Sequence, residues 1–395
     1  MVEVVAAPRV HTGSAWLEPG WVRWEGERVV DVGSGQPPSR PSAELADGVL
    51  APGLVDAQLN GAFGHDLVDA DAAGWSEVLS LLPSTGTTAA VPTFITAPVE
   101  ELAGALRRRA ALHPGLEELP GAARAVGVHL EGPFLSSRRR GAHREHLLVD
   151  PAPEAVDALV DAAGGHLVYL TLAPERSGAL DAVRRLAAAG VRVAVGHSDA
   201  SEAQARAAAD AGATLVTHLF NAQRPLHHRD PGVVGAALAD PRFTVGLIAD
   251  GHHVAPSAVA IAFAAAPGRV MLVTDATAAL GMRPGRYSLG GVEVEVPADG
   301  PPVRADGTMA GSSLRMDDAV AGAVACGVDL GTALAAATRV PADALGRTDL
   351  GRLEPGSAAD LVHLGPDGES SLRARATWVR GRLAWSAAPE LSERR

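Results

Sequence analysis

Eight apolar segments that alternate with alanine-rich stretches restrict the fold of this chain more than any other feature. Each segment is a nearly continuous apolar run, as expected for parallel strands that are covered on both faces. Helical stretches such as SEAQARAAADAG separate most of them. The alternation predicts an α/β fold, a (β/α)8 TIM-like barrel. The eight segments are GLVDAQLN, TTAAVPTF, ARAVGVHLEG, HLVYLTLAPE, VRVAVGHSD, ATLVTHLFN, FTVGLIADG and RVMLVTDAT.

Polar side chains are concentrated at the carboxyl ends of these predicted strands. In a (β/α)8 barrel these ends converge on one face, where active sites lie. A buried carboxylate or imidazole without a partner is costly, and one metal ion can satisfy several of them. We therefore expect Glu131, His197 and His218 to bind a metal. The strand-end residues are Gln58, Asn60, His129, Glu131, His197, His218, Asn221, Asp250, His252, His253 and Asp275.

Asp275 follows the last apolar segment, where we interpret it as a general base and acid. A metal lowers the pKa of its water towards ~7, and a nearby carboxylate can then take that proton and later deliver it. A helix N-cap or a structural ion pair is the alternative for Asp275. Two imidazoles and one carboxylate suit zinc, with iron, manganese or cobalt as alternatives. The histidines away from the strand ends are interpreted as surface residues: His11, His113, His166 and His363.

Composition excludes several classes of function. The chain contains no lysine, which excludes Schiff-base catalysis, a P-loop lysine and a carbamylated lysine that bridges two metals. The net charge of -12 argues against non-specific nucleic-acid binding. Cys326 is the single cysteine, and neither a signal-type segment nor a long uncharged apolar stretch is present. We therefore expect a cytoplasmic protein with no membrane span.

Further motifs occur in a characteristic order over about residues 50–320. With them the chain resembles the N-acetylglucosamine-6-phosphate deacetylases of the amidohydrolase superfamily. The resemblance implies hydrolysis of N-acetylglucosamine 6-phosphate to glucosamine 6-phosphate and acetate, in amino-sugar catabolism and cell-wall recycling. The short strands predicted at the two chain ends are similar to the family's small β-sandwich domain, which implies sandwich parts at 1–50 and 346–395 around a barrel at 51–345. The motifs are APGLVDAQLNG, VHLEGPFL, LTLAPE, VGHSDA, VTHLFNA, IADGHHV, VTDAT and GTMAGSSL.

The resemblance also implies roles for individual residues. It implies the same metal ligands and the same base as above, and it adds His143 as the group that polarises the amide carbonyl. It further implies a homodimer in which Arg229 of one chain reaches the phosphate bound to the other. The implied substrate contacts are Ala142, Asn221, Ala222, Arg229, Asp250, His253, Thr308, Met309 and Ala310.

One departure from many amidohydrolases concerns the number of metals. Their His-x-His motif holds a second metal, whereas this chain has Gln58 and Asn60 at that place. An amide is a poor ligand beside an imidazole, so we expect one divalent metal per chain. Gln58, Asn60 and His129 then either support the site or mark a vacant second-metal position.

Other functions remain open at this stage. The nearest alternative is the same chemistry on another N-acetylated hexosamine 6-phosphate, such as the galactosamine epimer, which the sequence does not exclude. A cyclic-amide hydrolase of the dihydroorotase type usually needs the bridging lysine or paired histidines. A metal-dependent barrel lyase would use the same phosphate site and release no acetate, and a non-catalytic sugar-phosphate sensor would have little use for Asp275.

Overall fold

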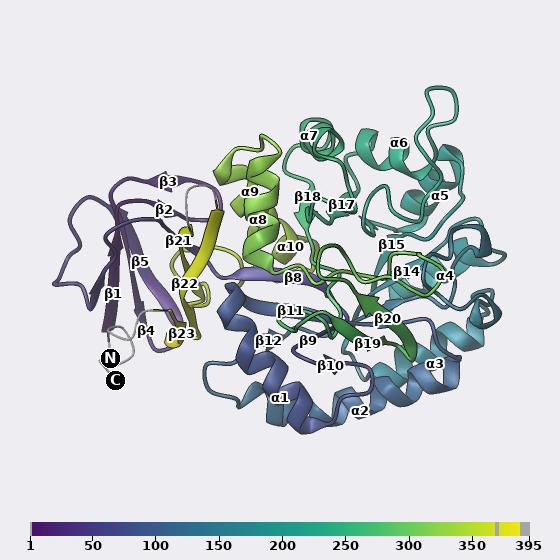
Figure 1. Cartoon of the computed structure of the whole chain (residues 1–395), viewed down its shortest axis with the longest axis horizontal. Helices are drawn as coiled ribbons and strands as arrows, with labels where there is room; N and C mark the ends of the chain where they lie inside the picture. Colours follow the sequence, from purple (N-terminus) through teal and green to yellow (C-terminus); the bar gives the residue numbers. More distant parts are fainter. Residues whose placement is uncertain (1, 368–370, 388–395) are drawn as a thin grey trace.

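Eight parallel strands form the barrel that makes up the larger part of the molecule (Figure 1). The computed structural model describes residues 2–367 and 371–387 of the chain. Neighbouring strands pair in chain order, and Leu59 pairs with Ala276 to close the barrel between the first strand and the segment after the last. The predicted TIM-like barrel is therefore confirmed. Its strands are β8 (Leu54–Leu59), β11 (Thr87–Ile95), β13 (Val128–Glu131), β14 (Leu167–Leu172), β15 (Arg192–Val195), β16 (Leu215–Val216), β17 (Thr244–Leu247) and β18 (Val270–Leu272).

Alternation along the strands fills two cores. In β11, Ala89 and Val91 point into the barrel, whereas Ala90 and Phe94 pack against the surrounding helices. Successive residues of a strand face opposite sides, so both faces of this sheet must be apolar. The barrel interior is therefore packed with side chains, and the cluster of ligand-type polar groups lies at its carboxyl end.

Helices cover the outside of the barrel, and their ends follow local sequence signals. The helix α5 starts with a capping box between Ser201 and Gln204, and α3 begins at Pro153 and ends before Gly164 in the left-handed conformation. None of the described helices is both long and apolar enough to cross a membrane. The α-helices are α1 (Ala72–Leu81), α2 (Val99–Glu117), α3 (Pro153–Ala163), α4 (Ala179–Ala188), α5 (Glu202–Ala211), α6 (Gly232–Ala239), α7 (Pro256–Ala265), α8 (Met316–Ala325), α9 (Leu330–Ala337) and α10 (Arg339–Ala344).

Both ends of the chain build a separate pair of sheets beside the barrel (Figure 1). This agrees with the expected β-sandwich domain, whereas its boundaries at residues 50 and 345 stay a prediction. The first sheet has the order β5-β4-β1-β6, and the second has the order β23-β22-β21-β7-β2-β3. Their strands are β1 (Val2–Ala7), β2 (Val10–His11), β3 (Trp16–Leu17), β4 (Gly20–Glu25), β5 (Arg28–Ser34), β6 (Ala43–Glu44), β7 (Val49–Pro52), β21 (Leu361–Asp367), β22 (Ser371–Val379) and β23 (Arg382–Ser386).

A hairpin between β18 and α8 contributes to the site. Its strands β19 (Gly285–Leu289) and β20 (Val292–Val296) pair with each other, and Leu289 and Val294 pack on Ile95 at the end of β11. The hairpin therefore lies against the carboxyl end of the barrel. The remaining short strands are β9 (Gly61–Ala62), β10 (His65–Asp66) and β12 (Arg124–Ala125).

Candidate active site

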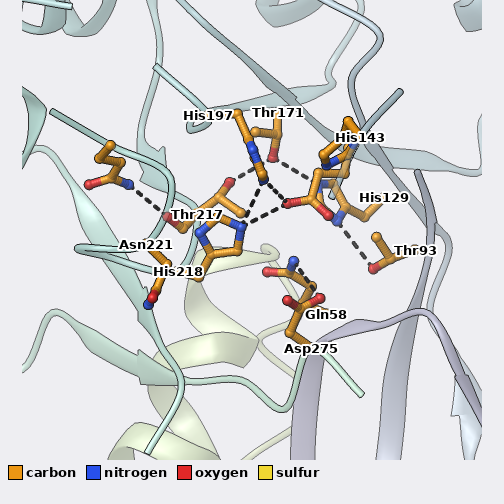
Figure 2. A network of polar contacts seen from close by, with 12 residues as sticks. Gln58, Thr93, His129, His143, Thr171, His197, Thr217, His218, Asn221 and Asp275 are labelled. Carbon is orange, nitrogen blue, oxygen red and sulfur yellow. Dashed lines mark hydrogen bonds and ion pairs between the residues drawn. The ribbon is translucent and has the colours of Figure 1, made fainter. Parts of the chain in front are cut away.

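Three side chains, at the ends of β13, β15 and β16, converge at the carboxyl face of the barrel. Glu131 Oε1 lies 3.0 Å from His197 Nε2 and 2.9 Å from His218 Nε2, and the two imidazole nitrogens are 3.1 Å apart (Figure 2). All three residues are buried. Donor atoms held at about 2.1 Å by one tetrahedral metal lie about 3.4 Å from each other, close to this spacing. The structure thus brings together the three residues that the sequence predicts as metal ligands.

The protonation of His197 tests whether this cluster suits a cation. Its Nδ1 lies 3.0 Å from the carbonyl oxygen of Arg139, which can only accept, so Nδ1 carries the proton. Nε2, which faces the carboxylate of Glu131, is then the ring nitrogen available to bind a metal. His143 offers a further ligand atom within 4.8 Å of those of Glu131 and His197. Ligand atoms that converge in a buried place suit a divalent metal, and the hydrogen bond at Nδ1 orients the imidazole of His197 as in known metal sites.

The backbone at the strand ends is strained at functional residues. His197, His218 and Asp275 have φ angles of 47°, 25° and 50°, in or near the left-handed region that residues other than glycine rarely adopt. Such a conformation costs about 1–3 kcal/mol and persists where the surroundings impose it. At these three positions the unusual backbone accompanies side chains that line the cavity.

Asp275 lies where the barrel closes. Its backbone N–H donates to the carbonyl of Gln58 at 2.9 Å, and its Oδ1 accepts from Gln58 Nε2 at 3.0 Å and from Asn60 Nδ2 at 2.8 Å. Burial raises the pKa of Asp275 to about 6, the charge of Glu131 adds to the rise, and His218 and the Asn60 amide oppose it. A carboxyl group with a pKa near neutrality suits a group that both accepts and donates a proton.

His143 is buried beside the cluster and bonded to a threonine. Its Nδ1 lies 2.8 Å from Thr96 Oγ1, and this hydroxyl is also 3.2 Å from the carbonyl oxygen of Glu131. A carbonyl oxygen can only accept, so the single hydroxyl proton of Thr96 is donated to Glu131. Thr96 then accepts from Nδ1–H of His143, and Nε2 of the neutral ring carries the lone pair. Burial lowers the pKa of His143 to about 3, and the nearby His197 lowers it further, so the ring is neutral at physiological pH.

Beneath the cluster, His129 belongs to a chain of hydroxyl groups. Its Nδ1 is 3.2 Å from Thr93 Oγ1, its Nε2 is 2.8 Å from Thr171 Oγ1, and Thr171 continues to Thr217 at 2.6 Å (Figure 2). The ring stacks on Tyr169, with centroids 3.8 Å apart. Both ring nitrogens are therefore engaged, and His129 supports the floor of the site.

A cavity of about 190 Å³ opens above these groups. It is lined by Glu131, His143, His197, His218 and Asp275. Most of the expected substrate contacts also line it, namely Ala142, Asn221, Ala222, His253, Thr308 and Met309.

Two of the expected contacts support the cavity without being among its lining residues. Asp250 Oδ2 lies 2.6 Å from His253 Nδ1, which leaves Nε2 of that ring as the atom able to contact a ligand. Ala310 is buried in the apolar cluster with Ile95 and Leu289. The expectation that these two residues contact the substrate directly remains a prediction.

Arg229 is a third expected contact that does not line the cavity. It is exposed, is not among the cavity-lining residues, and has Nη1 2.9 Å from His228 Nε2. The neighbouring Arg224 is partly neutralised, since it pairs with Asp230 at 2.9 Å and with Asp199 at 3.5 Å. Within one chain, the described residues that line the cavity include no arginine.

Reasoning from the sequence missed several residues at the site and misjudged two histidines. Thr96 follows an apolar segment directly, so its place at a strand end could have identified it. Ile95 and Leu289 line the cavity, and no polar signal marks them. The expectation that His11 and His363 are surface residues was wrong: they are 3% and 7% exposed, because each lies on a strand of the small domain packed beside the barrel.

These features define a class of protein, and comparison with known sequences agrees. A profile of the amidohydrolase family matches residues 49–383, and the chain belongs to this family. It is 38% identical to an N-acetylglucosamine-6-phosphate deacetylase from Vibrio furnissii, over 86% of this chain and 84% of that protein. It is also 37% identical to an N-acetylgalactosamine-6-phosphate deacetylase from Escherichia coli O157:H7, over 97% of this chain and 100% of that protein.

A solved structure gives the same result. The chain is similar to a mutant of the N-acetyl-D-glucosamine-6-phosphate deacetylase from Mycobacterium smegmatis, in complex with N-acetyl-D-glucosamine-6-phosphate. The TM-score is 0.90 at 38% sequence identity, and the match covers 98% of this chain and 100% of the other.

Proposed function

We infer that this protein hydrolyses N-acetyl-D-glucosamine 6-phosphate to D-glucosamine 6-phosphate and acetate, in amino-sugar catabolism. The observation that carries this inference is the convergence of Glu131, His197 and His218 with Asp275 in one cavity. An amidohydrolase family member with this site and with deacetylase relatives over most of its length is an amide hydrolase. The apolar cavity wall at Ile95 and Leu289 suits a methyl group such as that of an acetamide.

We propose one divalent metal per chain, with zinc as the first choice and iron, manganese or cobalt as alternatives. Glu131, His197 and His218 would hold it. When bound, it would supply Lewis-acid polarisation of a water molecule and of the amide carbonyl. Gln58 Nε2 and Asn60 Nδ2 both face Asp275, which supports the expectation that they bind no second metal.

The remaining chemistry belongs to side chains of this chain. Asp275 takes a proton from the attacking water and returns it to the sugar nitrogen as the amide bond breaks. Rotation of the Thr96 hydroxyl from the carbonyl of Glu131 to His143 Nδ1 would place the ring proton on Nε2, and this Nε2–H would donate to the amide carbonyl oxygen, where negative charge develops. Loss of such a donor typically lowers the rate ~10²–10³-fold.

We also propose a homodimer in which Arg229 binds the phosphate of the neighbouring chain. The exposure of Arg229, and the lack of arginine among the described cavity-lining residues, support a contribution from outside the chain. Mixing Arg229→Ala chains with Asp275→Asn chains tests this. A mixed dimer would have one site with both residues intact, so activity should reappear. Exchange of subunits without recovered activity would contradict the shared site.

The proposed activity is tested by acetate release from a panel of N-acetylated hexosamine 6-phosphates. We expect the highest kcat/KM with the glucosamine derivative. The second candidate substrate is the galactosamine epimer. The similarity to the N-acetylgalactosamine-6-phosphate deacetylase of E. coli supports this candidate. A higher kcat/KM for that epimer would replace the substrate but keep the chemistry. Turnover of a sugar phosphate without acetate would contradict a deacetylase and favour a lyase. We further propose that the enzyme is cytoplasmic.

A further inference from the structure

We propose that Gln58 and Asn60 are positioning residues that hold Oδ1 of Asp275 and leave Oδ2 as the oxygen that exchanges protons with the substrate. This proposal rests on the proposed function, because it assigns a task to the base of that reaction. It replaces the interpretation of these two amides as a vacant metal position.

The geometry gives both amides one target. Gln58 Nε2 and Asn60 Nδ2 donate to Oδ1 of Asp275 at 3.0 Å and 2.8 Å. Within residues 2–367 and 371–387, Oδ2 of Asp275 has no hydrogen-bond partner. All three side chains are buried, and Asn60 and Asp275 line the cavity. One carboxylate oxygen is thus occupied twice, and the other is free.

Hydrogen-bond chemistry fixes which way the Asn60 amide points. An ionised carboxylate can only accept, so the NH2 group must face Asp275 and the amide oxygen must point elsewhere. Asn60 Oδ1 is buried and has no partner among the described residues. A buried acceptor at a cavity wall is costly unless something donates to it. A water molecule beside Asp275 would satisfy it.

A second carboxylate, that of Asp56, holds Gln58, Asn60 and Asp275 in place. We call the arrangement of these three residues the clamp. Asp56 accepts from the backbone N–H groups of Gln58 and Thr274, both at 3.2 Å, and from Thr274 Oγ1 at 2.5 Å. Asp275 in turn donates its N–H to the carbonyl of Gln58 at 2.9 Å. The two amides and the base therefore belong to one rigid unit, formed where the first strand meets the segment after the last. Because the amides are fixed to the same backbone, they can restrict the carboxylate to one orientation.

Two consequences distinguish a clamp from simple structural support. Two donors stabilise the ionised form of Asp275 and oppose the effect of burial, so loss of one should move the acidic limb of the kcat/KM profile to higher pH. The amides do not contact the ligands Glu131, His197 and His218 in the structure, so metal content should be unchanged. A residue needed only for folding would lower the yield of active protein without moving the pH profile.

The test uses Asn60→Leu, which removes the donor at similar volume, and Asn60→Asp, which keeps the shape and replaces the donor by an acceptor. Thr88→Val is the matched control, because Thr88 is a buried polar residue bonded to Leu54 O near the start of β8, far from the cavity. For both Asn60 variants we expect a fall in kcat of about tenfold or more, the effect of one hydrogen bond to a charged group. KM should stay within about threefold, and the acidic limb should rise by about one pH unit. The control should change none of these.

A second measurement does not depend on activity. In metal-free protein at pH 8, Asn60→Leu should lower the urea midpoint more in the wild type than in an Asp275→Ala background, because the bond exists only in the former. Equal shifts in the two backgrounds, with kcat and the acidic limb unchanged, would overturn the clamp. Loss of metal from both Asn60 variants, without coupling to Asp275, would overturn it too and assign the amides to the metal site. Absence of acetate release by the wild type would refute the proposed function instead. The comparison of urea midpoints in the two backgrounds would still show whether Asn60 holds Asp275.

Discussion

Replacement of Asp275 by asparagine is the most direct test of the mechanism. Asparagine has nearly the same shape, and its Oδ1 can still accept from Gln58 and Asn60 at 3.0 and 2.8 Å. Its NH2 group would then stand where Oδ2 stands, as a donor in place of an acceptor. The variant therefore keeps the geometry and loses the base. General acid–base catalysis contributes about 10²–10⁴ in rate, or about 3–5 kcal/mol of activation free energy.

We expect kcat of Asp275→Asn to fall by about 10²–10⁴ in an acetate-release assay, with the metal content of the wild type. The folded protein should be no less stable at pH 8. Burial raises the pKa of Asp275 to about 6 from an ordinary value of 3.8, so its ionised form opposes folding above that pH, and the penalty fades as pH falls from about 6 towards 3.8.

Asp240→Asn is the matched control, since it removes a buried carboxylate before β17, at the opposite end of the barrel, where Asp240 pairs with Arg242 at 2.7 Å. This change should alter stability and leave kcat close to the wild-type value. A kcat of Asp275→Asn within about tenfold of the wild type would remove Asp275 from the proton transfers. Loss of the metal instead would make Asp275 a ligand.

Three further predictions concern pH, metal and His143. Asp275 must be ionised to act as a base, and a bound cation can only lower its pKa below about 6. We therefore expect kcat/KM to decline only below about pH 6. A decline of kcat/KM that begins above pH 7 would contradict the assignment of Asp275 as the base. Elemental analysis should give about one divalent metal per chain, and removal by a chelator should abolish acetate release; two metals that are both required would refute the single-metal site. Thr96→Val should lower kcat about 10–100-fold because the tautomer of His143 is no longer fixed, whereas Thr96→Ser should retain most activity. Equal activity of the two Thr96 variants would show that the hydroxyl is unnecessary.

The sequence predicted the barrel because its constraints are local and repeated. Parallel strands covered on both faces need continuous apolar runs, and each such run in this chain forms a barrel strand. The position of polar residues at the ends of the predicted strands then identified Glu131, His197 and His218, because the carboxyl ends of the strands converge in any barrel of this type. It also located Asp275 and, as a strand-end polar residue, Asn60. The small domain followed from short alternating segments, although their register and sheet order did not.

What only the tertiary structure decided is how these groups face each other. Spacing along the chain cannot show that Gln58 and Asn60 both donate to one oxygen of Asp275, because more than 200 residues separate the partners, 217 and 215 positions respectively, and barrel closure joins them. Nor can it show that Thr96 bonds His143, or that Arg229 stays outside the cavity of its own chain. Hydrogen bonds depend on distances of a few tenths of an ångström and on direction. Periodicity in a sequence fixes which face a residue lies on, and only packing fixes those distances.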